Sequence, residues 1–201
     1  IKIKGANEVI YEHTCKNGLV IYVWPYNLSE EVYLTLTVKY GSVHTEFNIE
    51  GKDYKVPNGI AHFLEHIKFN EAKDQTAHDY FYKLGSYTNA YTTYDHTSYE
   101  VVCSNSIKEN LTHLLYFVLN PYFTKGLIQK EKPIIIEESK MILNNPYNIG
   151  FNTLMNNVYK VNKKKHLVTG QAEDIKAITI EDVQTVFNNF YHPKNMFLTV
   201  T

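Results

Sequence analysis

The sequence is poor in the features that mark secreted, membrane and nucleic-acid-binding proteins. It has only two cysteines, Cys15 and Cys103, which are too few for a disulfide framework and are expected to stay reduced. No apolar stretch approaches the roughly 20 residues needed to cross a membrane. Lysine and arginine number 20 against 21 acidic residues, so no basic surface for nucleic acid or anionic lipid is indicated. We therefore expect a cytoplasmic protein with no nucleic-acid and no membrane partner.

The chain does have enough apolar and aromatic residues for a packed core. Apolar residues make up 44% of its 201 residues, and 17 tyrosines and 10 phenylalanines suit a sheet-rich core or a peptide-binding cleft. We place a single domain over residues 1–201. The first residue is not methionine, and the sequence stops inside the apolar run Met196 to Thr201. We expect this domain to be part of a longer polypeptide.

Local patterns predict alternating strands and helices. Two strands are expected within residues 8–24 around the hairpin turn Asn17-Gly18, followed by a central strand at Val32–Tyr40. The polar stretch Gly41–Pro57 is expected to be an irregular loop. Further strands are predicted at Ser86–Tyr91, Thr97–Ser104 and Met196–Thr201, and helices at Asn58–Phe69, Ala77–Leu84, Ser106–Leu119, Thr124–Leu143, Tyr147–Val161 and Thr179–Phe190.

Several helix ends have recognisable signals. Asn58 can cap the first turn of its helix, Ser106 with Glu109 forms a capping-box pattern, and Thr179 has Asp182 three residues later. The mixed order of strands and helices indicates an α+β domain. We expect a mostly antiparallel sheet with helices packed on one face.

The segment His62-Phe63-Leu64-Glu65-His66 has the spacing of a metal site. Residues four apart lie on one face of a helix, so His62 and His66 can present two imidazole nitrogens to a single Zn²⁺. Zinc lowers the pKa of a bound water, and Glu65 can accept its proton as the water attacks a carbonyl. This is the HxxEH, or inverzincin, pattern. The alternative is a pair of surface histidines on an amphipathic helix.

A catalytic zinc ion needs a third protein ligand and an open position for water. Glu131 and Glu138 are seven residues apart and share a helix face, so one can bind the metal while the other orients the site. The alternative is a solvated acidic helix face, which the three isoleucines 134–136 make less favourable. Pro133 falls between the two glutamates and is expected to kink the helix, which weakens the assignment of the third ligand.

The sequence resembles the pitrilysin/insulinase family of zinc metallopeptidases, and in particular the N-terminal domain of bacterial, processing-peptidase-like members. The resemblance rests on motifs that span nearly the whole chain: Asn17-Gly18-Leu19, Lys39-Tyr40-Gly41-Ser42, Gly59 to His66, Asn89-Ala90-Tyr91-Thr92, Asn120-Pro121-Tyr122-Phe123, Glu131-Lys132 with Glu138, and Tyr191-His192-Pro193.

The resemblance assigns a role to each of these site residues. It implies that Glu138 is the third zinc ligand, with neighbouring Glu137 as the alternative, and that Glu131 supports catalysis without binding metal. It also implies that an extended peptide substrate binds along the strand that contains Asn89 and Ala90, and we add Tyr91 as a candidate contact.

The resemblance also implies that a second half closes over the substrate, supplied by the same protein or by a partner subunit, so that homo- and heterodimers are both open. We expect a zinc-dependent metalloendopeptidase domain with one zinc ion, and the isolated domain to be weakly active or inactive. The sequence leaves open manganese in place of zinc. It also leaves open a non-catalytic peptide-binding partner subunit and a purely structural zinc domain.

Overall fold

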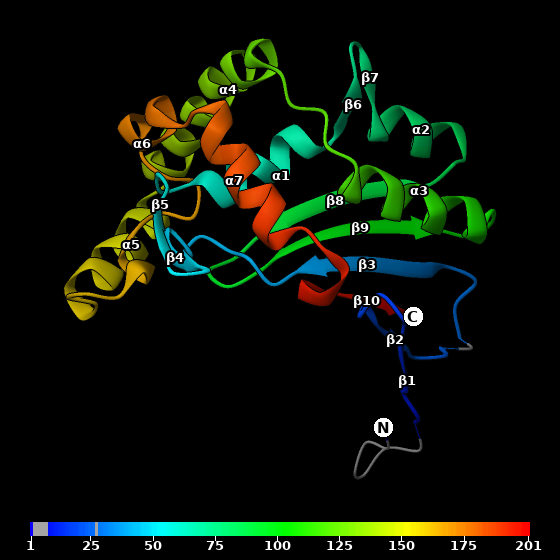
Figure 1. Cartoon of the computed structure of the whole chain (residues 1–201). Coiled ribbons are helices and arrows are strands. Elements are labelled where there is room, and N and C mark those ends of the chain that lie inside the picture. Colours follow the sequence, from blue (N-terminus) through cyan, green and yellow to red (C-terminus); the bar gives the residue numbers. More distant parts are fainter. Residues whose placement is uncertain (2–7, 27) are drawn as a thin grey trace.

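A computed structural model describes residue 1, residues 8–26 and residues 28–201 (Figure 1). Its main sheet has six strands in the order β1-β2-β10-β3-β9-β8. All neighbouring strands are antiparallel except β10 and β2, which are parallel. The strands are β1 (Tyr11–Thr14), β2 (Val20–Val23), β3 (Val32–Val38), β8 (Tyr87–Thr92), β9 (Thr97–Cys103) and β10 (Met196–Val200).

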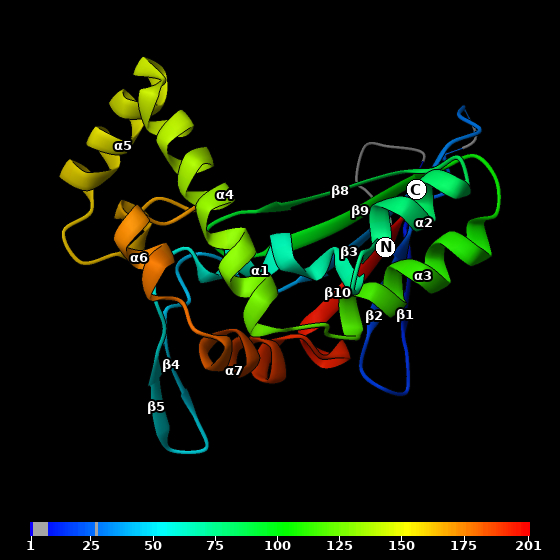
Figure 2. The ribbon, with the colours of Figure 1, turned by 90° about the horizontal axis from the view of Figure 1, so that it is seen from above.

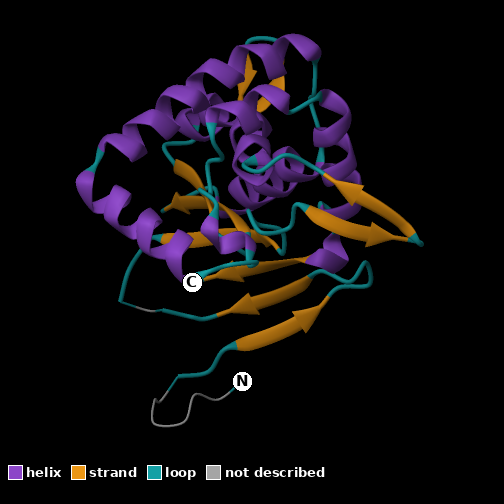
Figure 3. Ribbon diagram, turned by 90° about the vertical axis from the view of Figure 1, so that its left-hand side faces the viewer, coloured by secondary structure: helices purple, strands orange, loops and turns teal. Residues whose placement is uncertain are grey.

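The helices gather on one face of this sheet (Figures 1 and 3). The expected α+β fold with a mostly antiparallel sheet is confirmed. The helices are α1 (Ile60–Lys68), α2 (Ala77–Lys83), α3 (Ile107–Leu119), α4 (Lys125–Asn144), α5 (Pro146–Val158), α6 (Ala172–Ala177) and α7 (Ile180–Phe190), with 3-10 turns η1 (Lys163–Lys165) and η2 (Pro193–Asn195). In the described part of the chain, no helix has the length and apolar character of a membrane span.

Strand β3 shows why the helices cover only one face. Its residues alternate, so that Leu34, Leu36 and Val38 point one way and are at most 1% exposed. Thr35 and Thr37 point the other way, where Thr37 Oγ1 lies 2.8 Å from Ser98 Oγ on β9. The apolar face binds the helices, and burial of its side chains is the main stabilising contribution.

Helix α1 lies between the sheet and α4 and is buried on nearly every side. Its apolar residues Phe63, Leu64 and Ile67 are fully buried, as expected for core positions. The same placement also buries the polar residues His62 and Glu65. A buried polar side chain is costly unless it has a partner, so these two positions need a specific explanation.

Three local predictions are wrong. The stretch Gly41–Pro57 contains a hairpin, β4 (Glu46–Ile49) with β5 (Lys52–Lys55), which turns at Glu50 and Gly51, both with positive φ, and extends away from the sheet (Figure 2). Asn58 does not cap α1, because its side chain donates to Asp174 and Gly59 occupies the N-cap position. Ser106 has no capping bond either, because it adopts a left-handed conformation with φ 49°.

The other helix and strand predictions agree with the structure within a few residues. The turn Asn17-Gly18 joins β1 and β2, although only Gly18 has positive φ. Thr179 and Asp182 form the predicted capping box of α7. The sequence patterns missed α6, both 3-10 turns and the small hairpin of β6 (Asn70–Ala72) and β7 (Gln75–Thr76).

Candidate metal centre

Three side chains from two helices meet at one point. His62 and His66 come from α1, one turn apart, and their ring centroids are separated by 4.5 Å. Glu138 comes from α4, and its two oxygens lie 3.6 Å from His62 Nε2 and 3.3 Å from His66 Nε2. One ligand atom from each of the three residues falls within a mutual distance of 4.8 Å. This donor set, two imidazoles and a carboxylate, is one that catalytic zinc sites use.

The neighbouring glutamates of α4 have different contacts. Glu131 Oε1 lies 3.1 Å from Nδ1 of His66, so the two ring nitrogens of His66 face two different carboxylates. A carboxylate in this position fixes the orientation of a metal-binding imidazole. Glu137 instead pairs with Lys140 at 2.6 Å on the exposed side of the helix. The structure therefore brings Glu138 to the histidines and leaves Glu137 outside the centre.

Glu65 lies beside the two histidines but outside this ligand group. Its side chain is buried, and its Oε2 accepts a 2.6 Å hydrogen bond from the hydroxyl of Thr92 on β8. Thr92 Oγ1 also lies 3.4 Å from the Thr97 hydroxyl, which donates to the carbonyl oxygen of Tyr40. The carboxylate of Glu65, although it belongs to α1, is thus oriented by a strand of the sheet. The three residues of the ligand group come from α1 and α4.

Burial and charge set the protonation of these groups. Burial, with a smaller contribution from His66, lowers the pKa of His62 to about 3, so its ring is neutral at pH 7, the form that binds metal. Burial also raises the pKa of Glu65, partly opposed by the bond from Thr92. For His66, burial lowers the pKa, but the hydrogen bond to Glu131 and the carboxylates of Glu65 and Glu138 outweigh it and raise the pKa overall. Three carboxylates around two imidazoles make the centre attractive to a divalent cation.

Pro133 does not disrupt the arrangement as expected. Helix α4 continues through it from Lys125 to Asn144. Proline removes one backbone donor, but Glu131 and Glu138 still reach opposite nitrogens of the same imidazole, His66. The geometry at Pro133 therefore does not weaken the assignment of Glu138 as the third ligand.

A cleft of about 330 Å³ opens beside the centre. Glu65, His66 and Glu131 line one side, and Asn89 and Ala90 line another from β8, the edge strand of the main sheet. The side chain of Tyr91 lies on the opposite face of the sheet from the centre, where its ring contacts His96. The structure therefore brings Asn89 and Ala90 to the cleft and directs the Tyr91 side chain away from it.

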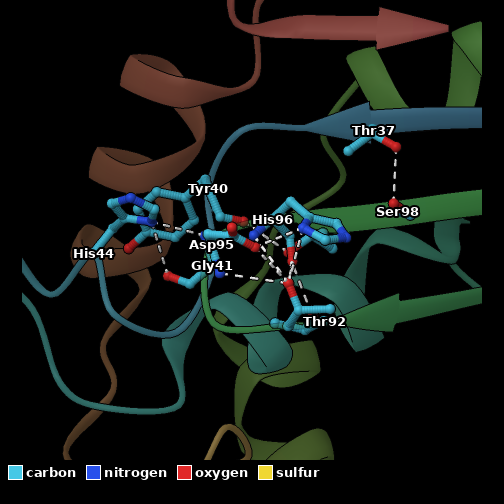
Figure 4. A network of polar contacts seen from close by, with 10 residues as sticks. Thr37, Tyr40, Gly41, His44, Thr92, Asp95, His96 and Ser98 are labelled. Carbon is cyan, nitrogen blue, oxygen red and sulfur yellow. Dashed lines mark hydrogen bonds and ion pairs between the residues drawn. The ribbon is translucent and has the colours of Figure 1, made fainter. Parts of the chain in front are cut away.

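The turn between β8 and β9 forms a separate polar network (Figure 4). His96 Nδ1 lies 2.7 Å from Asp95 Oδ1 and 3.0 Å from Thr93 Oγ1. Gly41 packs so closely on this turn that a Cβ there would lie 2.5 Å from the amide nitrogen of Asp95. The network fixes the end of β8 next to Thr92.

Sequence reasoning missed several residues of the site. Thr92 gave no signal on its own, because its role depends on a pairing between a strand and a helix that are distant in sequence. The exposed ring of His78 stacks on Phe69 with 4.2 Å between the ring centroids, and both residues line the cleft. Asn70 and Thr76 complete that wall.

Comparison with known proteins identifies the class to which this fold and centre belong. The family model described as Insulinase (Peptidase family M16) matches residues 23–171. The chain is also 36% identical over its whole length to the uncharacterized zinc protease YmfH of Bacillus subtilis, of which it covers 47%. The chain therefore belongs to the insulinase family, peptidase family M16.

Solved structures agree with this assignment. A putative M16-like peptidase from Alicyclobacillus acidocaldarius superposes on 97% of this chain with a TM-score of 0.90 and 31% identity, and the match covers 46% of that protein. An inactive M16 peptidase domain from Pseudomonas fluorescens shares the fold, with a TM-score of 0.80 at 17% identity over 96% of this chain and 46% of that one. The chain spans about half the length of these relatives, and the fold occurs in inactive domains as well.

Proposed function

We propose that this domain is the catalytic, zinc-binding half of a metalloendopeptidase. The observation that supports this most strongly is the convergence of His62, His66 and Glu138 within 4.8 Å, with Glu65 beside them. The donor set fits zinc, because both rings reach Glu138 through Nε2 and His62 is neutral. A structural zinc site needs neither an adjacent buried carboxylate nor an open cleft, and this centre has both.

Bound zinc would supply Lewis acidity for the attack of water on a peptide carbonyl. His62, His66 and Glu138 would hold the ion. Glu65 would take the proton from the attacking water and pass it to the leaving amine, a role that suits a carboxylate whose pKa is raised by burial. Thr92 would orient Glu65, and Glu131 would fix the His66 ring.

We propose that the substrate is an extended peptide segment that pairs with the free edge of β8 at Asn89 and Ala90. Main-chain pairing needs an exposed strand edge, and β8 offers one beside the centre. Because such pairing recognises the backbone, it gives affinity with little sequence preference. The Tyr91 side chain points to the far face, so we assign its contribution to the strand backbone.

We further propose that the active enzyme includes a second half, either from the same polypeptide or from a partner subunit. The relatives are about twice as long as this chain, which supports such a half. We also propose a cytoplasmic location, supported by the free thiols of Cys15 and Cys103. Fractionation of the native cells, followed by detection of the protein, tests the location, and recovery outside the cytoplasm would contradict it.

The test is the Glu65→Gln substitution in the full-length protein. We expect loss of hydrolysis of an unstructured peptide by at least about 10³-fold, with one zinc ion retained, because Glu65 lies outside the group of His62, His66 and Glu138. Glu137→Gln is the matched control, because this exposed neighbour pairs with Lys140 outside the centre, and it should be as active as the wild type. A zinc-loaded wild type that cleaves no peptide would contradict the proposal and favour the non-catalytic partner subunit.

A further inference from the structure

The residue that follows Glu138 on α4 is tied to a distant loop. Ser139 is 3% exposed, and its hydroxyl donates a 2.8 Å hydrogen bond to the carbonyl oxygen of Gly170. Gly170 lies in the short loop between η1 and α6, within residues 167–170, and outside the ligand group. A helical serine usually bonds to its own helix or to water, so this long-range bond needs an explanation.

The same loop also touches the start of the histidine helix. Gly170 and Gly59 both have positive φ, 77° and 80°, and their backbones are in contact. A Cβ on Gly59 would collide with the carbonyl oxygen of Thr169 and lie 2.8 Å from Gly170 Cα. Gly59 precedes α1 directly, and its carbonyl oxygen accepts the 2.9 Å bond from Phe63 that opens the helix. Only a residue without a side chain fits here.

A second contact fixes the same junction. Asn58 donates a 3.2 Å hydrogen bond to Asp174 of α6, immediately beyond the loop. The start of α1, two residues before His62, is therefore held by the 167–170 loop and by α6. Helix α4 is held by the same loop through Ser139, one residue after Glu138.

We propose that Ser139, Gly59 and Gly170 form a clasp that sets the distance between Glu138 and His62, and that Ser139 and Gly59 are positioning residues of the metal centre. The inference rests on the proposed zinc site. Ligand atoms must approach zinc to about 2.0–2.2 Å, and displacements near half an ångström weaken such a site. The clasp fixes the two ligand helices to one rigid point, independently of the ion.

The first test measures zinc affinity of the full-length Ser139→Ala protein by competition with a chelator. We expect binding about tenfold weaker than wild type, in the range seen when the supports of metal ligands are removed. The absorption bands of the cobalt-substituted protein should also change, because they report ligand geometry. Thr179→Ala is the control, since it removes a helix cap on α7, which carries no ligand, and should leave both readouts unchanged.

The second test uses a pair of glycines. Gly59→Ala combines an unfavourable φ with a collision against the loop, whereas Gly51→Ala has a similar φ of 85° with nothing within 4 Å of the new Cβ. We expect weaker zinc binding only for Gly59→Ala. If Ser139→Ala and Gly59→Ala bind zinc as tightly as the wild type with an unaltered cobalt spectrum, the clasp proposal is overturned and the proposed function stands. A wild type that binds no zinc overturns both.

Discussion

The bond between Thr92 and Glu65 allows a quantitative test of how the proposed base is tuned. Burial raises the pKa of Glu65, and the 2.6 Å hydrogen bond from Thr92 is the largest influence that opposes it. Thr92→Val keeps the shape of the side chain and removes the donor. A hydrogen bond to a charged acceptor contributes about 1.5–3 kcal/mol, so the ionised form of Glu65 loses stabilisation of that order.

The sign follows from the proposed role of Glu65 as a base. Its pKa rises further in the variant, so the acidic limb of the kcat/KM profile moves to higher pH. On that limb, activity at a fixed pH falls about ten- to a hundredfold, because a tenfold change corresponds to about 1.4 kcal/mol. Activity should recover as the pH is raised, and zinc content should not change.

The assay is the pH dependence of kcat/KM for the full-length zinc-loaded protein with an unstructured peptide. Thr88→Val is the matched control, because Thr88 lies on the same strand and face but donates to the backbone oxygen of Glu100 at 2.8 Å. Its acidic limb should coincide with that of the wild type. If the limb of Thr92→Val also coincides with the wild type, Thr92 does not tune Glu65.

Three other outcomes follow from buried and half-buried groups. Burial lowers the pKa of Lys68 from 10.5 to about 7. Between these pH values, Lys68 is protonated in the unfolded state and neutral in the folded state. The free energy of unfolding should therefore rise by about 1.4 kcal/mol per pH unit from about pH 7 to 10. Lys68→Met should lack this increase in denaturant titrations across that range, and an equal slope in both proteins would refute it. Glu131→Gln should weaken zinc binding about 10- to 100-fold in chelator competition, because it changes the partner of His66; unchanged affinity would contradict this role. Leu36→Ala should lower the free energy of unfolding by about 2–5 kcal/mol, since Leu36 is fully buried, and a loss below about 1 kcal/mol would contradict its place in the core.

The strands and helices with strong periodicity could be predicted from the sequence, because their pattern depends only on neighbouring residues. Strand β3 alternates apolar residues with threonine from Leu34 to Val38, and the Thr179–Asp182 capping box needs only four consecutive residues. The caps at Asn58 and Ser106 failed because a distant partner, Asp174, and a left-handed backbone decided them. The β4–β5 hairpin was missed because its turn residues, Glu50 and Gly51, do not form a common turn pair.

The same distinction applies to the site. The spacing of His62 and His66 specifies their shared face, so the pair could be predicted locally. The choice between Glu137 and Glu138 depends on how α4 is rotated against α1, which only packing determines. Thr92 and the wall formed by Phe69 and His78 depend on contacts between separate elements, and no local pattern indicates them.

The position of β10 has a consequence for synthesis on the ribosome. This strand, Met196–Val200, lies between β2 and β3. The N-terminal hairpin of β1 and β2 therefore cannot join the main sheet until β10 has been synthesised. A nascent chain that has exposed α1 and α4 could bring the ligand helices together while β2 and β3 still offer unpaired edges. Pairing across such long sequence separations is slow, so this domain should depend on chaperone protection until its last strand is made.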